Sequence, residues 1–157
     1  KDGPAKLLNK TPVSNTQFQD EFFAFEKEQQ YFVRAVSIGS NGDPAESRES
    51  NIVAVTPVDT FAPDPPASIT LAATQNSISI FFAANVEKDI AGYRIYRSTD
   101  ANTPQANWEL LTPNLLTTNT FRDDNVQPGV RYFYYITAVD KKGNVSVPSE
   151  TVSEMIR

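Results

Sequence analysis

Alternating apolar and polar residues along this chain predict β-strands rather than helices. In residues 77–82 the order Ser-Ile-Ser-Ile-Phe-Phe places Ile78, Ile80 and Phe82 on one face of an extended strand. Residues 132–139 show a similar run of aromatic and β-branched side chains, and turn sequences rich in Gly, Pro and Asn separate such runs. No window of helical length has a sustained helical period. Short strands at this spacing predict an all-β fold, namely an antiparallel β-sandwich.

The chain repeats itself at a fixed offset of 103 residues. The residues that recur without a gap are Leu7, Leu8, Phe18, Asp20, Tyr31, Ala35 and Val36, which return as Leu110, Leu111, Phe121, Asp123, Tyr134, Ala138 and Val139. A fixed offset indicates two copies of one structural unit. In the second copy residues 67–109 precede the shared stretch, whereas six residues precede it in the first. We therefore expect a complete second sandwich and a first one that lacks its initial strands.

A proline-rich segment separates the two copies. Residues 56–66 include Pro57, Pro63, Pro65 and Pro66, which disfavour a helix, remove hydrogen-bond donors and favour an extended, semi-rigid spacer. The expected organisation is a partial domain at residues 1–55, a linker at 56–66 and a complete domain at 67–157.

The residue types that the chain lacks exclude several classes of site. There is no Cys and no His, so disulfides, thiolate metal sites and Ser-His-Asp or Cys-His catalysis are excluded for this chain alone. With 14 basic and 19 acidic residues and no basic excess in either copy, we expect no nucleic-acid partner. No apolar run approaches the ~20 residues that span a bilayer. We predict a non-enzyme with no cofactor and no bound metal. Because the first residue is Lys1 rather than Met, we expect a processed or truncated product.

The second copy carries several motifs in an order that resembles the fibronectin type III family, as in its bacterial extracellular members. Residues 89–98 are similar to the family's third strand with its lead-in, and residues 126–132 to the loop and corner before the sixth strand. Residues 138–144 are similar to the exit of that strand, and residues 148–150 to the start of the last. In the first copy the resemblance covers only the later strands. It implies tandem fibronectin type III sandwiches, which are immunoglobulin-like, with the first one incomplete.

The resemblance also implies structural roles for individual residues of the second copy. Phe82 stands where the family usually has a Trp on the second strand, and Tyr132 matches the corner tyrosine, whose hydroxyl reaches a backbone group. Gln29 occupies the corner position in the first copy, so we expect an altered corner there. By its pattern Phe121 belongs to the core of the second copy.

Acidic pairs occur at equivalent places in both copies, as Asp20-Glu21 and Asp123-Asp124. Calcium binding is one interpretation, because hard cations prefer several oxygen ligands. We favour a structural role at a strand-end turn, in which the Asp accepts backbone hydrogen bonds, because no Asp-x-Asp-x-Asp loop is present. The linker carboxylates Asp59 and Asp64 are too few to predict a calcium clip.

Aromatic residues offer two further candidate surfaces. Cross-strand packing is the favoured interpretation of five residues that could also form a face for a sugar or a peptide: Tyr93, Tyr96, Tyr132, Tyr134 and Tyr135. In the first copy, Phe22 and Phe25 replace Asn125 and Pro128 of a solvent-facing loop, and Phe23 occupies the core position of Val126. These phenylalanines either contact a partner or fill the altered corner beside Gln29, and the sequence favours neither interpretation.

Two functions from different classes fit the sequence. The first is a non-catalytic structural and interaction module of an extracytoplasmic bacterial protein, either secreted, periplasmic or at the cell surface as a lipoprotein. It acts as a spacer and protein-docking surface, as an accessory subunit of a larger envelope complex. Its expected partner is a protein, or a missing N-terminal part of the same polypeptide, that completes residues 1–55. This hypothesis allows the chain to be attached to a membrane complex or to a lipid anchor upstream. The alternative is an accessory carbohydrate-binding or spacer region of a secreted glycoside hydrolase or other polysaccharide-degrading enzyme.

Overall fold

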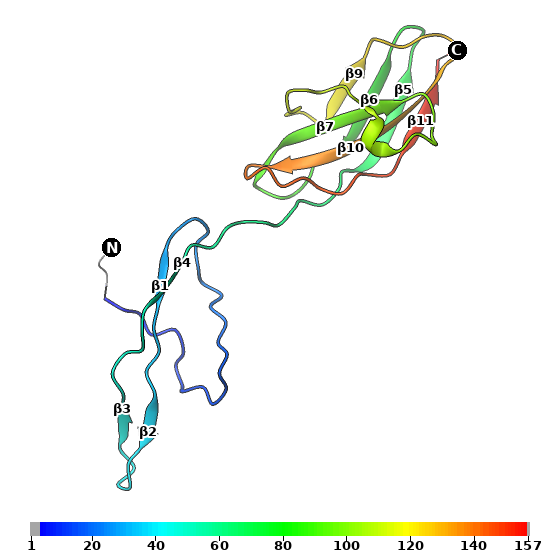
Figure 1. The fold of residues 1–157 in the computed structure, drawn as a ribbon. Helices are drawn as coiled ribbons and strands as arrows, with labels where there is room; N and C mark the ends of the chain where they lie inside the picture. Colours follow the sequence, from blue (N-terminus) through cyan, green and yellow to red (C-terminus); the bar gives the residue numbers. More distant parts are fainter. Residues whose placement is uncertain (1–3, 157) are drawn as a thin grey trace. The chain divides into compact units, whose positions relative to one another are not determined.

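The computed structural model describes residues 4–156, and the chain divides into two compact units, Lys1–Asp59 and Thr60–Arg157. Strands, turns and loops build both units (Figure 1). The one helical element among the described residues is a single 3-10 turn, η1 (Gln105–Asn107). The all-β class predicted from the alternating pattern is therefore confirmed. None of the described residues forms a helix with the length and apolar character needed to cross a bilayer.

The second unit consists of two antiparallel sheets packed face to face, as Figure 1 shows. One sheet has the order β5-β6-β9, with bounds Ala67–Ala73, Ile78–Ala83 and Thr120–Asp123. The other has the order β11-β10-β7-β8, with bounds Val152–Met155, Arg131–Asp140, Ile90–Ser98 and Glu109–Leu110.

The core of the second unit follows from the period-two pattern. On β6 the side chains of Ile78, Ile80 and Phe82 are buried, and on β10 those of Tyr134 and Ile136 are fully inaccessible to solvent. Phe82 meets Tyr93 of β7 edge to face, with ring centroids 4.7 Å apart. Phe121 on β9 is half-buried against this cluster. Burying apolar area contributes about 25 cal/mol per Å2, so this two-sheet core is the main source of stability in the unit.

A smaller aromatic cluster lies on the outer face of the β7–β10 sheet. Tyr135 stacks on Tyr96 with centroids 4.6 Å apart and contacts Trp108 at 5.1 Å. The Tyr135 hydroxyl donates to the carbonyl of Gln105, and Trp108 Nε1 donates to that of Thr103. The turn η1 thus holds the indole over the sheet, and both Tyr135 and Trp108 are buried.

The end of the proline-rich segment is attached to the second unit. Pro66 is buried, and the backbone N–H of Asp64 donates to Glu87 over 2.8 Å. Asn85 Nδ2 donates to the Asp64 carbonyl, also over 2.8 Å. The hydrogen bond from Asp64 lowers the pKa of Glu87. The backbone around Asp64 is therefore held by two side chains rather than by strand pairing.

Between residues 4 and 59 the first unit has four short strands in two separate two-stranded sheets. Strand β1 (Gln29–Tyr31) pairs with β4 (Val53–Val55), and β2 (Val36–Ile38) pairs with β3 (Pro44–Glu46). Gly42 adopts a φ of +86° in the β2–β3 turn, a conformation that favours glycine. None of the strand residues of this unit is buried.

Candidate functional site

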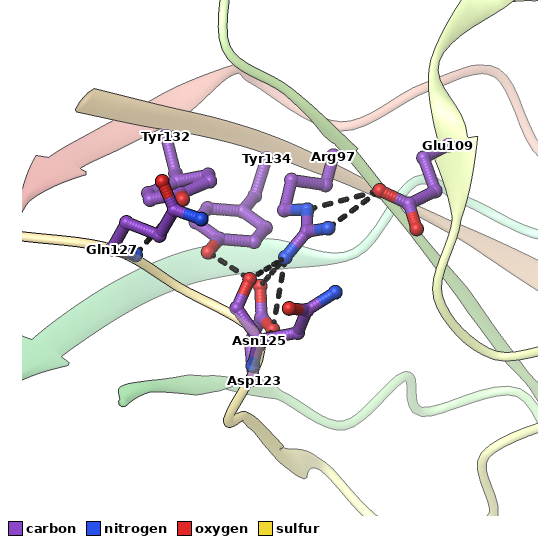
Figure 2. Close-up of polar contacts among 7 residues, drawn as sticks. All are labelled: Arg97, Glu109, Asp123, Asn125, Gln127, Tyr132 and Tyr134. Atoms are coloured by element: carbon purple, nitrogen blue, oxygen red, sulfur yellow. Dashed lines mark hydrogen bonds and ion pairs between the residues drawn. The ribbon is translucent and has the colours of Figure 1, made fainter. Parts of the chain in front are cut away.

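A buried ionic cluster joins the two sheets of the second unit, as Figure 2 shows. Arg97 of β7 donates from Nη1 to both carboxylate oxygens of Asp123, over 3.0 and 2.8 Å, and to the carbonyl of Asn125 over 2.7 Å. Its Nη2 donates to Glu109 over 2.6 Å. The side chains of Arg97 and Asp123 are only 8% and 4% exposed. Two buried opposite charges are thus paired and hydrogen-bonded, as burial of charge requires.

Tyrosines complete this cluster. The hydroxyl of Tyr134 donates to Asp123 over 2.9 Å, and the backbone N–H of Asn125 donates to the same carboxylate over 3.0 Å. Burial and the adjacent Asp123 carboxylate raise the pKa of Tyr134 far above its usual value. Tyr132 accepts from the backbone N–H of Gln127 over 3.0 Å, and the Arg97 guanidinium lies 5.3 Å from its ring centroid (Figure 2).

The first unit reproduces part of this arrangement around Asp20. The Tyr31 hydroxyl donates to Asp20 over 2.9 Å, as Tyr134 does to Asp123. The backbone N–H of Phe22 donates to Asp20 over 2.9 Å, as that of Asn125 does to Asp123. Both aspartates thus accept a turn N–H, whereas Asp124 forms an exposed ion pair with Arg122. The hydrogen bond to Asp20 raises the pKa of Tyr31.

Hydrogen bonds to serine hydroxyls also correspond between the two units. In the second unit Ser149 Oγ accepts from the backbone N–H of Ile136, and Ser146 Oγ accepts from that of Ala138. In the first unit the backbone N–H groups of Val33 and Ala35 donate to Ser50 Oγ and Ser47 Oγ in the same way. All four serines also donate to the carbonyl of the next residue. The first unit therefore repeats the hydrogen bonding of the later strands of the second unit.

Three phenylalanines that follow Asp20 in the sequence, Phe22, Phe23 and Phe25, are accessible to solvent. Phe22 is 86% exposed, and Phe23 and Phe25 meet edge to face with centroids 5.1 Å apart. A small open hollow nearby is lined by Leu8, Phe18 and Phe22 together with Asp20. Gln19 and Glu21 complete the lining, so three apolar side chains lie beside two carboxylates.

Two members of the cluster, Arg97 and Glu109, were not predicted from the sequence. Arg97 lies two residues after Ile95 and four after Tyr93, so period-two alternation directs it to the core face of β7. A charged residue at an inward position was the available signal, because such residues are rarely buried unless they are paired.

No family model matches the sequence. The chain is 30% identical over 145 residues to Exoglucanase B of Cellulomonas fimi, a match that covers 90% of this chain and 12% of that protein. The chain thus spans about an eighth of the length of this curated relative.

Solved structures show the fold. The FN1–FN3 domains of chicken CNTN1 align with a TM-score of 0.56 at 20% identity, covering 89% of this chain and 46% of that one. An Fn3-like protein from Clostridium thermocellum aligns with a TM-score of 0.50 at 21% identity, covering 59% of this chain and 92% of that one. Together with the two-sheet core, these likenesses establish that the chain has an all-β, immunoglobulin-like fibronectin type III fold.

Proposed function

We propose that this chain is a non-catalytic spacer region within a larger extracytoplasmic bacterial enzyme that degrades polysaccharides. The observation that carries the proposal is the similarity to Exoglucanase B over 145 residues, a length that takes in residues of both units. The relative is named for an activity on glucan, and the matched stretch is a small part of its length. A chain without His or Cys, built on a two-sheet fold, fits an accessory part of such a protein better than its catalytic part.

The aromatic cluster of the second unit favours a spacer over a carbohydrate-binding surface. A sugar-binding platform needs exposed aromatic faces, whereas Trp108 and Tyr135 are 7% and 5% exposed. Their polar atoms already bond to backbone carbonyls, so these groups are engaged within the unit. The large aromatic residues that are exposed among the described residues are phenylalanines, which offer a sugar no hydrogen bond.

Two measurements test this proposal. The complete reading frame of the gene should encode a glycoside hydrolase domain on the same polypeptide, and a frame without any catalytic domain would overturn the assignment. The 157-residue chain should also remain in solution when it is mixed with microcrystalline cellulose. Retention on cellulose that soluble glucan competes away would instead make the chain a binding module.

A docking role for the first unit has its own support. We propose that residues 1–55 are completed by a further segment of the same polypeptide or by a protein partner, and that Phe22, Phe23 and Phe25 contact it. Leu7, Phe18 and Val33 are 79%, 53% and 73% exposed, an unusual density of apolar surface for a unit this small. In the second unit the equivalent of Phe18, Phe121, packs against the core and that of Val33, Ile136, lies within it, whereas Leu110, the equivalent of Leu7, is 39% exposed.

Hydrogen exchange on the full chain tests the docking role. The amides of residues 31–36 should exchange much faster than those of residues 134–139, because their strands lack a covering sheet. Equal protection of the two segments in a monomeric chain would contradict the proposal.

A further inference from the structure

The first unit differs from the second at one particular edge. Strand β10 pairs with β11 on one side and with β7 on the other. Strand β1 pairs with β4 in the equivalent register, since Tyr31 faces Val53 as Tyr134 faces Val152. Within residues 4–156, β1 has no neighbour on its other side. The edge that corresponds to the β7 side of β10 is therefore free.

The side chains next to the free edge of β1 are more exposed to solvent than their equivalents in the second unit. Ile136 is fully buried beneath the second sheet, whereas its equivalent, Val33, is 73% exposed. Ala138 on the same face is buried, and its equivalent, Ala35, is exposed. The second unit thus shows what covers this face when the unit is complete, namely β7 at the edge and the opposing sheet above it.

Charge distinguishes the two units as well. In the second unit Asp123 receives two hydrogen bonds from Arg97, in addition to those from Tyr134 and Asn125. Asp20 receives the bonds from Tyr31 and Phe22, yet no Lys or Arg among the described residues forms an ion pair with it. A carboxylate has about four acceptor positions, so Asp20 retains capacity for a cation.

We infer that the free edge of β1 binds an extended, antiparallel strand that carries an arginine opposite Tyr31, and that the guanidinium pairs with Asp20. In the second unit Arg97 is the residue directly opposite Tyr134. The expected strand resembles β7, with aliphatic or aromatic residues alternating toward the face of Val33. This inference rests on the proposal that residues 1–55 are completed by another segment, and it specifies that segment's chemistry.

One feature of the second unit is not repeated. By the offset of 103, Lys6 stands where Glu109 stands, so the second carboxylate on Arg97 has no counterpart. The arginine of the docked strand therefore depends on Asp20 and on the carbonyl of Phe22, which is equivalent to that of Asn125. Removing the charge of Asp20 should then have a large effect on docking.

The test supplies the strand in covalent form. A copy of residues 89–100, which include β7, is fused ahead of Lys1 in the full chain through a flexible Gly/Ser linker, giving an effective concentration on the order of millimolar. Hydrogen exchange is read at Phe32 and Arg34. Since the N–H groups of Val33 and Ala35 bond to serines on the β4 side, strand alternation directs those of Phe32 and Arg34 to the free edge.

Matched variants distinguish the arginine–Asp20 ion pair from docking of the strand itself. We expect exchange at Phe32 and Arg34 to slow by at least about tenfold in the fusion, and to recover by a similar factor with Arg97→Ala in the fused copy or with Asp20→Asn. Glu21→Gln, which removes the adjacent charge, should leave the protection unchanged. Residues 134–139 report within each sample that the second unit is folded.

The outcomes are distinguishable. Protection that survives both Arg97→Ala and Asp20→Asn would overturn the arginine pairing and leave completion by a strand intact. Absence of protection in every fusion, with the second unit folded, would overturn strand addition at β1 and the completion proposal together. Restored protection when the charges are exchanged, with Asp20→Arg in the chain and Arg97→Asp in the fused copy, would confirm the pair.

Discussion

Tyr134 donates its hydroxyl hydrogen to Asp123 over 2.9 Å in the interior of the second unit. The bond crosses between the two sheets, because Tyr134 lies on β10 and Asp123 ends β9. Arg97, from the same sheet as Tyr134, neutralises the same carboxylate. One aspartate thus ties together β7, β9 and β10, which belong to two different sheets.

Removing Arg97 should destabilise the second unit severely. Arg97→Ala leaves the Asp123 carboxylate buried without its cation, and we expect the free energy of unfolding to fall by ~3–5 kcal/mol. The matched control is Arg122→Ala, which breaks an ion pair whose side chains are 65% and 66% exposed and should cost about 0–1 kcal/mol. Urea unfolding followed by fluorescence of the single Trp, Trp108, reports this unit. Equal losses for the two variants would contradict the expectation.

Two adjacent phenylalanines on β6 should respond very differently to truncation. Phe82 is 4% exposed and contacts Tyr93, so Phe82→Ala should lower the free energy of unfolding by ~3–5 kcal/mol through lost burial and a cavity. Phe81, on the opposite face, is 43% exposed, and Phe81→Ala should cost less than about 1.5 kcal/mol. Denaturant midpoints of the two variants against the parent chain measure the difference.

The stability of the second unit should decline in alkali because of Tyr134. Its pKa is raised in the folded state by burial and by Asp123, so folding favours the neutral phenol. The corresponding stability is fully present below the unfolded-state pKa of about 10 and is lost as pH rises above it. Urea midpoints between pH 8 and 11 should fall in the parent chain and fall less in Tyr134→Phe. Tyr31→Phe, in the first unit, should leave the Trp108 profile unchanged.

The second unit should fold without the first. Its described core residues all come from Ile69 to Ile156, and the proline segment is held at Asp64 by Glu87 and Asn85. Residues 60–157 expressed alone should therefore melt cooperatively, within a few degrees of the Trp108 transition in the full chain. A fragment that lacks amide dispersion in NMR spectra would refute this.

The sequence was sufficient for the fold class because the strands carry their own pattern. Alternation predicted that Ile78, Ile80 and Phe82 share one face, and the all-β sandwich is confirmed. It could not predict the Arg97–Asp123 pair, since that contact depends on how two sheets align across 26 residues of sequence. Nor could it predict that Trp108 covers Tyr135, because η1 has no apolar periodicity of its own.

The first unit shows a different limit of sequence reasoning. The repeated Asp20 and Tyr31 were visible at the offset of 103, and with the second unit's bonds known the contact between them follows. What the repeat could not supply is the residue opposite Tyr31, because no strand within the described chain lies there. The sequence pattern identifies the side chains on each face of a strand, whereas the strands that pair with it depend on the rest of the fold.

The attachment of Asp64 to Glu87 and Asn85 has a mechanical consequence. Tension transmitted along the proline segment would reach these hydrogen bonds before it reached β5, which begins three residues later at Ala67. Two side-chain bonds of 2.8 Å would yield under load while the β5–β6 pairing stayed intact. Loss of the attachment would therefore lengthen the tether under force before β5 has to separate from β6.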